Sequence, residues 1–164
     1  MKRITIKDKE YTFTFSIEAS LYDECTKSVM DQFVKSGMVS SAAQDGDTDS
    51  AIENVLDTIA SLPQRTLTLF YAGLLECHGS YGDKSVSGKN DAKYILAAYL
   101  RESKKSYRDV FAEMMEIMAD DSFFDLIGLN QWTEALSGEE PTETQEKEQQ
   151  DENGKAGKNT SDKK

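Results

Sequence analysis

The chain has 164 residues and a formal net charge of −11, with 38% hydrophobic and 30% charged residues. This length suits one domain with an appendage. The negative charge disfavours nucleic acid and anionic membranes as partners, because clustered Lys and Arg bind both. No apolar run follows Met1-Lys2-Arg3, and no stretch approaches the ~20 apolar residues of a transmembrane helix. We therefore expect a cytoplasmic protein with neither a signal peptide nor a membrane span.

Hydrophobic residues are distributed unevenly along the chain. From Glu139 to Lys164 the only one is Ala156, among eight acidic and five basic residues. Such a segment cannot bury enough apolar surface to offset the entropy lost on ordering. The sequence therefore predicts a folded domain at 1–138 and a disordered charged tail at 139–164.

The first fifteen residues alternate as a β-hairpin does. With Asp8 and Lys9 as a two-residue turn, Ile6 would face Tyr11 and Ile4 would face Phe13, which makes one face apolar. A lone hairpin is marginal in water, so it needs helices to pack on. We expect a register in which the numbers of opposing residues sum to 17.

Apolar residues recur at helical spacing through the rest of the domain. A first helix is expected to end near Gly37, followed by a loop from Ser40 to Asp49. Ser50 and Glu53 then match a capping box, and the helix that they open should stop before Pro63. Further helices are expected up to His78-Gly79, from about Ala92, after a cap at 106–109, and as a short piece from Phe123. The predicted fold is α+β, mainly α, with an N-terminal hairpin packed on a bundle of five or six helices.

Catalytic and metal-binding templates fail in specific ways. The only histidine, His78, lies beside a helix-ending Gly, where a C-terminal cap or dipole partner is commoner than a catalytic base. The acidic loop from Asp45 to Asp49 lacks the Gly and Glu that a calcium loop requires at later positions. Gly88-Lys89 has the wrong spacing for a phosphate loop and follows a helix. We therefore predict no catalytic residue, cofactor or metal site, and no enzymatic activity.

Two groups are candidates for binding a partner protein. Flexible methionines suit loosely accommodated partners, and aromatic residues anchor many interfaces. Core packing at helical spacing is the favoured explanation of the first group, and stapling of the last helix onto the domain explains the second equally simply. The candidate partner-binding residues are Phe111, Met114, Met115 and Met118 in the first group, and Phe123, Phe124 and Trp132 in the second.

The sequence resembles the tail assembly chaperones of long-tailed, siphovirus-type bacteriophages of Gram-positive bacteria. The resemblance rests on the opening Ile-Thr-Ile-Lys-Asp-Lys-Glu-Tyr, on Ser122-Phe123-Phe124 with Leu129-Asn130-Gln131-Trp132, and on the charged tail. It covers roughly residues 1–136. It implies a non-enzymatic protein that coats the long helical tape-measure protein, keeps it soluble, recruits major tail (tube) protein subunits and is absent from the virion.

The resemblance also implies a second, longer product made by a programmed ribosomal frameshift near the end of the short one. A slippery heptamer that includes Gly-Lys codons needs a preceding codon ending in G. Asn153 has no such codon, but Ala156 does, so Ala156-Gly157-Lys158 is a permissible slip site.

Two other functions remain open at this point. A virion structural protein, such as a head–tail adaptor or a minor tail protein, would stay in purified particles, whereas a chaperone would be missing from them. A small acidic regulatory binding module would need a contiguous acidic face, but the negative charges are spread along the chain. Self-association is also left open by the sequence.

Overall fold

The structure, a computed structural model, describes residues 1–45 and 48–129, without the side chains of 35–45, 48–51 and 54. The predicted tail at 139–164, the domain boundary at 138 and the candidate anchor Trp132 lie outside the described residues. The described part is mainly helical and begins with a two-stranded antiparallel hairpin. The predicted fold class, α+β and mainly α, is confirmed. The elements are β1 (Lys2–Ile6), β2 (Lys9–Phe13), α1 (Ile17–Leu21), α2 (Asp23–Asp45), α3 (Thr48–His78), α4 (Lys89–Ser103), α5 (Tyr107–Asp120) and α6 (Phe123–Leu126).

The hairpin forms in a different register from the one expected. Ile4 pairs with Tyr11 and Ile6 with Lys9, so opposing numbers sum to 15 instead of 17. The turn residues are Lys7 and Asp8, both with positive φ (50° and 61°), as a tight two-residue hairpin turn requires. A shift of two residues leaves every side chain on its own face. The predicted apolar face therefore survives, although the predicted cross-strand partners are wrong.

Helices α2 and α3 are longer than the sequence predicts. α2 continues through Gly37 to Asp45, and α3 begins at Thr48, so the predicted loop at 40–49 is wrong for 40–45 and 48–49. Ser50 lies inside α3 and does not cap it. The physical reason is tertiary, because α2 and α3 pack against each other and packing outweighs weak local propensity.

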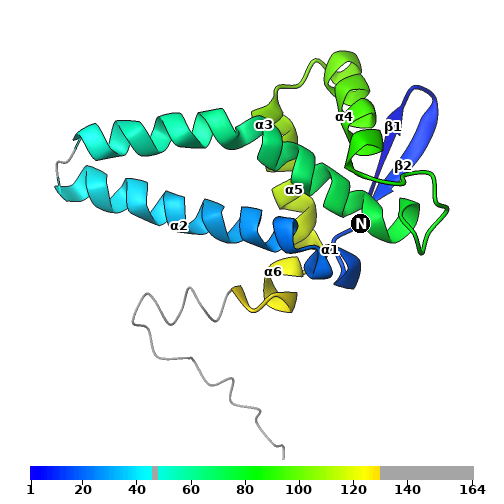
Figure 1. The fold of residues 1–164 in the computed structure, drawn as a ribbon, viewed down its shortest axis with the longest axis horizontal. Helices are drawn as coiled ribbons and strands as arrows, with labels where there is room; N and C mark the ends of the chain where they lie inside the picture. Colours follow the sequence, from blue (N-terminus) through cyan, green and yellow to red (C-terminus); the bar gives the residue numbers. More distant parts are fainter. Residues whose placement is uncertain (46–47, 130–164) are drawn as a thin grey trace, which may run out of the picture.

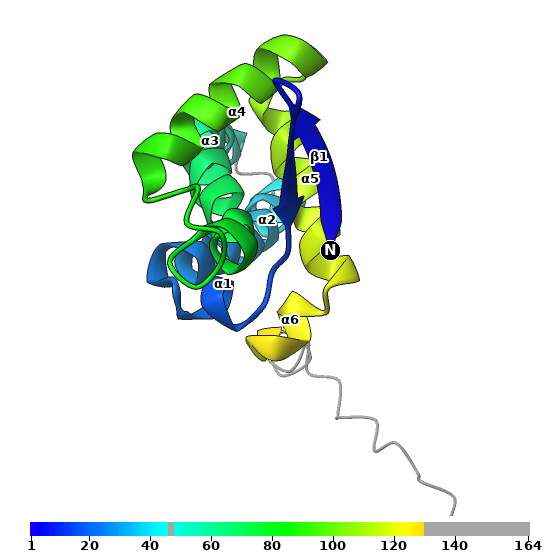
Figure 2. The same cartoon turned by 90° about the vertical axis from the view of Figure 1, so that its right-hand side faces the viewer.

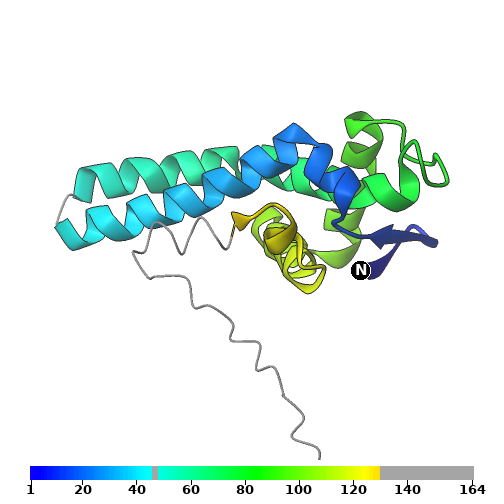
Figure 3. The same ribbon diagram turned by 90° about the horizontal axis from the view of Figure 1, so that it is seen from below.

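Pro63 does not end the second predicted helix but lies inside α3. Proline removes one backbone hydrogen bond and its ring crowds the preceding turn, which bends a helix. Figure 1 shows α3 changing direction part of the way along its length. The part before the bend runs beside α2 and projects away from the hairpin, and Figure 3 shows the same pairing from below. We call this projection, formed by the second half of α2 and by α3 up to Leu62, the arm.

The core lies where the hairpin, α3, α4 and α5 meet. The hairpin packs on α3 and α4, and Figure 2 shows it standing between α4 and α5. The strand approaches α3 closely at Gly73, whose carbonyl accepts a 2.9 Å hydrogen bond from the backbone N–H of Thr14. A Cβ at Gly73 would lie 3.0 Å from Phe13 and 3.1 Å from Phe15, two fully buried rings. The missing side chain of Gly73 therefore sets how closely the hairpin can pack.

The start of α5 forms as the sequence predicts. The Ser106 hydroxyl accepts a hydrogen bond from the backbone N–H of Asp109, and the Asp109 carboxylate accepts one from the backbone N–H of Ser106. This reciprocal capping box satisfies two donors that a helix start leaves free. The predicted cap at 106–109 is confirmed.

Candidate functional site

Four aliphatic side chains on the arm lie exposed on one face of α3. Their exposed fractions are 43% or more, and their positions follow the i, i+3, i+4, i+7 spacing of a single helix face. Scattered exposed apolar residues are normal on protein surfaces, but a contiguous apolar face is typical of an interaction site. We call this face the arm stripe, and it consists of Ile52 (58%), Val55 (43%), Leu56 (61%) and Ile59 (61%).

The sequence predicts a helix between Ser50 and Pro63 that contains these four residues, but it does not predict that they are uncovered. Their spacing predicts an amphipathic helix, and the usual inference is that the apolar face packs into the domain. Here the arm projects beyond the core, so no described element covers that face. The missed feature was a tertiary one, since periodicity does not show what a helix packs against.

Arg65 fixes the base of the arm. Its guanidinium donates a 2.7 Å hydrogen bond to the Ser28 carbonyl and a 3.0 Å hydrogen bond to the Gln32 side chain, both on α2. The guanidinium also lies 5.8 Å from the centre of the Phe111 ring. Burial lowers the pKa of Arg65, and the nearby charge of Asp31 opposes that shift. These contacts join α2, α3 and α5 where the arm leaves the core.

Most of the first predicted partner-binding group belongs to the core. Phe111 is 9% exposed, and Met114 and Met118 are fully buried, whereas Met115 is partly buried. The burial of these side chains is what core packing of an amphipathic helix would produce. The structure therefore brings this group together, but mainly inside the domain.

The second predicted group divides between the core and its edge. Phe123 is fully buried, and its ring lies 5.7 Å from that of Phe15 in an edge-to-face contact. Phe124 is partly buried, and its ring lies 5.7 Å from that of Phe33 on α2. Phe123 thus packs α6 onto the domain, as the stapling alternative expects, while Phe124 lies beside a ring that is 38% exposed.

His78, the last residue of α3, links the hairpin to the loop after α3. Its Nε2 accepts a 2.9 Å hydrogen bond from the backbone N–H of Thr12, and its Nδ1 lies 3.0 Å from an Asp83 carboxylate oxygen. Hydrogen bonds from Ser85 lower the pKa of Asp83 to about 2, with a smaller contribution from His78. Both ring nitrogens therefore hold structural contacts in a side chain that is only 8% exposed.

A charged cluster centred on Glu113 connects α4, α5 and β1. The carboxylate accepts hydrogen bonds from the Tyr99 hydroxyl and the Lys105 ammonium, both at 2.7 Å, and lies 2.8 Å from the Lys2 ammonium. Burial raises the pKa of Glu113, but the hydrogen bonds from Lys105, Lys2 and Tyr99 outweigh it and hold the pKa below its usual value. Every charge here has a partner, so the cluster is a structural ion-pair network.

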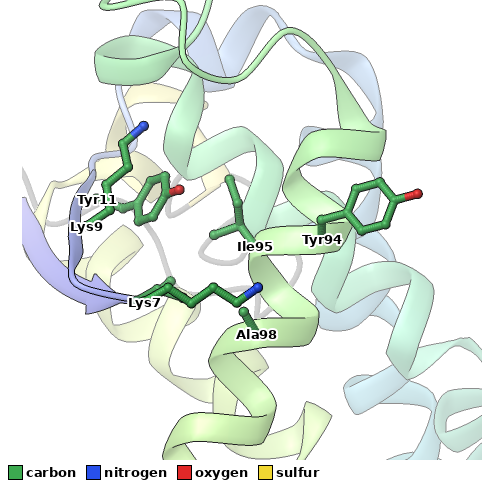
Figure 4. Close-up of a pocket in the computed structure, with 7 residues that line it drawn as sticks. Lys7, Lys9, Tyr11, Tyr94, Ile95 and Ala98 are labelled. Carbon is green, nitrogen blue, oxygen red and sulfur yellow. The ribbon is translucent and has the colours of Figure 1, made fainter.

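A small hollow lies between the hairpin turn and α4 (Figure 4). Its volume is about 270 Å³, slightly below the roughly 300 Å³ at which small-molecule sites begin. The Lys9 ammonium lies 5.0 Å from the centre of the Tyr11 ring, so this charge already makes a cation–π contact within the protein. The lining residues are Ile6, Lys7, Lys9, Tyr11, Tyr94, Ile95 and Ala98.

Within residues 1–45 and 48–129, no helix is both long enough and apolar enough to cross a bilayer. The same residues contain no cluster of three or more His, Cys, Asp or Glu side chains that could hold a metal ion. Comparisons with protein-family models, with curated proteins and with solved structures each return no match.

Proposed function

We propose that this protein is a tail assembly chaperone of a long-tailed bacteriophage. It binds the tape-measure protein in the cytoplasm of the infected or lysogenic host, keeps it soluble, recruits major tail (tube) protein subunits and is released before the virion is complete. The proposal follows from the resemblance in the sequence. The observation that supports it is the arm stripe, an uncovered apolar helix face.

The stripe suits this task for a physical reason. A long amphipathic helix that has not yet assembled exposes an apolar face, and such faces cause aggregation. A second helix that lays its own i, i+3, i+4, i+7 residues against that face removes it from water. The net charge of −11 on the protein would keep the resulting complex dispersed.

Co-expression with the tape-measure protein of the same genome tests the proposal. We expect this protein to raise the soluble fraction of the tape-measure protein, and we expect Val55→Asp with Leu56→Asp to abolish the effect. Tyr81→Ser with Tyr94→Ser is the matched control, because these side chains are 84% and 76% exposed outside the arm. A tape-measure protein that stays equally insoluble with and without this protein would overturn the proposal.

The protein content of purified phage particles distinguishes a chaperone from a virion structural protein. Mass spectrometry of the particles should find the tube and tape-measure proteins without this protein. Its presence at a stoichiometric level would favour a head–tail adaptor or minor tail protein instead.

A further inference from the structure

Negative charge lies along one edge of the arm stripe. At 100° per residue, Glu53 lies about 60° and Asp57 about 100° beyond Leu56 round the helix, both on the side of the stripe away from Val55. Both side chains are exposed. From Thr48 to Leu62 the sequence contains no Lys or Arg. The stripe therefore has an acidic edge that no basic residue of the same segment neutralises.

This edge disfavours a second copy as the occupant of the stripe. Antiparallel pairing of two arms would place the acidic edge of one against the acidic edge of the other, and like charges across a helix pair are repulsive. Four partly exposed aliphatic side chains also fall short of the roughly 800 Å² that each partner buries in a stable interface. The occupant should instead supply positive charge.

We propose that the arm stripe binds an amphipathic helix that carries Lys or Arg along one edge of its apolar face, opposite Glu53 and Asp57. This inference rests on the proposed function and specifies the class of segment that the tape-measure protein presents. Apolar contact supplies the attraction, and the charges fix which edge of the partner helix faces which edge of the arm.

The length of the stripe sets how tightly one arm binds. Seven residue steps from Ile52 to Ile59 span roughly 10 Å, or about two helical turns. So short a contact gives weak, reversible binding at each site. A long partner helix with repeated basic-edged stripes would therefore carry several copies of this protein, each of which can be displaced separately.

Two synthetic helical peptides of four heptads test the inference directly. Both carry Leu on one face, and they differ only in having Lys or Glu along one edge of that face. We expect the Lys-edged peptide to bind the full chain at least tenfold more tightly than the Glu-edged peptide in 50 mM salt. Raising the salt to 300 mM should reduce that difference, because screening weakens exposed charge pairs.

A charge reversal locates the effect on the arm. Glu53→Lys with Asp57→Lys should reverse the preference, so that the Glu-edged peptide binds more tightly. Glu116→Lys with Asp120→Lys is the matched control. These residues form an exposed acidic i, i+4 pair on α5, and their reversal changes the net charge by the same amount. The control should keep the preference of the unmodified protein, which excludes general attraction to an acidic surface.

The outcomes separate this inference from the proposed function. Equal binding of both peptides, abolished by Leu56→Asp, would overturn the basic-edge inference and leave the stripe as a helix-binding site. Failure of both peptides to bind would overturn the inference and remove the observation that supports the proposed function. The protein could also prefer the Lys-edged peptide and yet leave the soluble fraction of the tape-measure protein unchanged in co-expression. That pair of results would overturn only the proposed function.

Discussion

The Asp121 carboxylate accepts a 2.8 Å hydrogen bond from the backbone N–H of Phe15, 106 residues earlier in the chain. The same carboxylate oxygen accepts a 3.0 Å hydrogen bond from the Thr14 hydroxyl. Asp121 follows the last residue of α5, where the helix dipole disfavours negative charge. The segment after β2 thus supplies hydrogen-bond donors that stabilise the negative charge of Asp121 at the end of α5. The same hydrogen bonds fix the hairpin to α5.

Replacing Asp121 should test this link. Asp121→Ala leaves the Phe15 N–H without its acceptor, and we expect the free energy of unfolding to fall by about 2 kcal/mol. Asp121→Asn keeps one oxygen and should cost about half as much. Urea denaturation monitored by circular dichroism measures both, and Asp120→Asn, at an exposed neighbour, should stay within about 0.5 kcal/mol of the unmodified protein.

The contribution of Asp121 should depend on pH. Burial raises its pKa, but the Met1 amino group, the Phe15 N–H and the Thr14 hydroxyl outweigh burial and lower the pKa below its usual value. The stabilisation that the ionised Asp121 carboxylate contributes is therefore complete above its pKa in the unfolded chain, about 3.9. It is lost as the pH falls through the lower pKa that this carboxylate has in the folded protein. The difference in unfolding free energy between the unmodified protein and Asp121→Asn should be constant from pH 5 to 6.5 and shrink toward pH 3. A difference that grows with acidification would contradict this assignment.

Removing the Glu113 carboxylate should destabilise the domain. Glu113→Ala leaves the Tyr99 hydroxyl and the Lys105 ammonium without their common acceptor, and both ammonium groups in the cluster are partly exposed, which weakens the effect. We expect a loss of about 2 kcal/mol in thermal or urea unfolding. Glu116→Ala, an exposed position on the same helix, is the control, and an equal loss there would show that the helix and not the cluster is responsible.

Neutral His78 should carry its proton on Nδ1. Nε2 accepts the Thr12 N–H and so cannot itself bear a hydrogen, whereas Nδ1 faces Asp83. Long-range ¹H–¹⁵N NMR distinguishes the two tautomers. In His78→Ala the Thr12 amide should lose protection from hydrogen exchange, while the Thr14 amide, bonded to the Gly73 carbonyl, keeps it. Equal loss at both amides would mean that the whole hairpin detaches.

Adding a methyl group at Gly73 should be unfavourable despite the better helix propensity of Ala. Ala gains about 0.5–1 kcal/mol in a helix interior, but overpacking against Phe13 and Phe15 costs about 1–3 kcal/mol. We expect Gly73→Ala to lower the free energy of unfolding by about 1 kcal/mol in urea denaturation. A double-mutant cycle is the control: Gly73→Ala should cost less in a Phe15→Leu background, where one of the two rings that crowd the added methyl group is gone.

The sequence predicts only part of the candidate site. The spacing of Ile52, Val55, Leu56 and Ile59 identifies an amphipathic helix, but the same spacing at Met114 and Met118 belongs to residues that are fully buried. Periodicity reports which residues share a face. Whether that face is covered depends on where the helix lies relative to the rest of the domain.

Local features of this protein follow from its sequence alone, because short-range chemistry controls them. Alternation assigned the two faces of the hairpin, and the Ser106–Asp109 capping box marked the start of α5. Local preferences leave three other features nearly balanced, and contacts between distant segments set them. These features are the turn at Lys7-Asp8, the passage of α3 through Pro63 and the uncovered arm. The reason is that helix pairing and core burial each contribute more free energy than one turn residue or one proline costs, and these contributions exist only once distant segments meet.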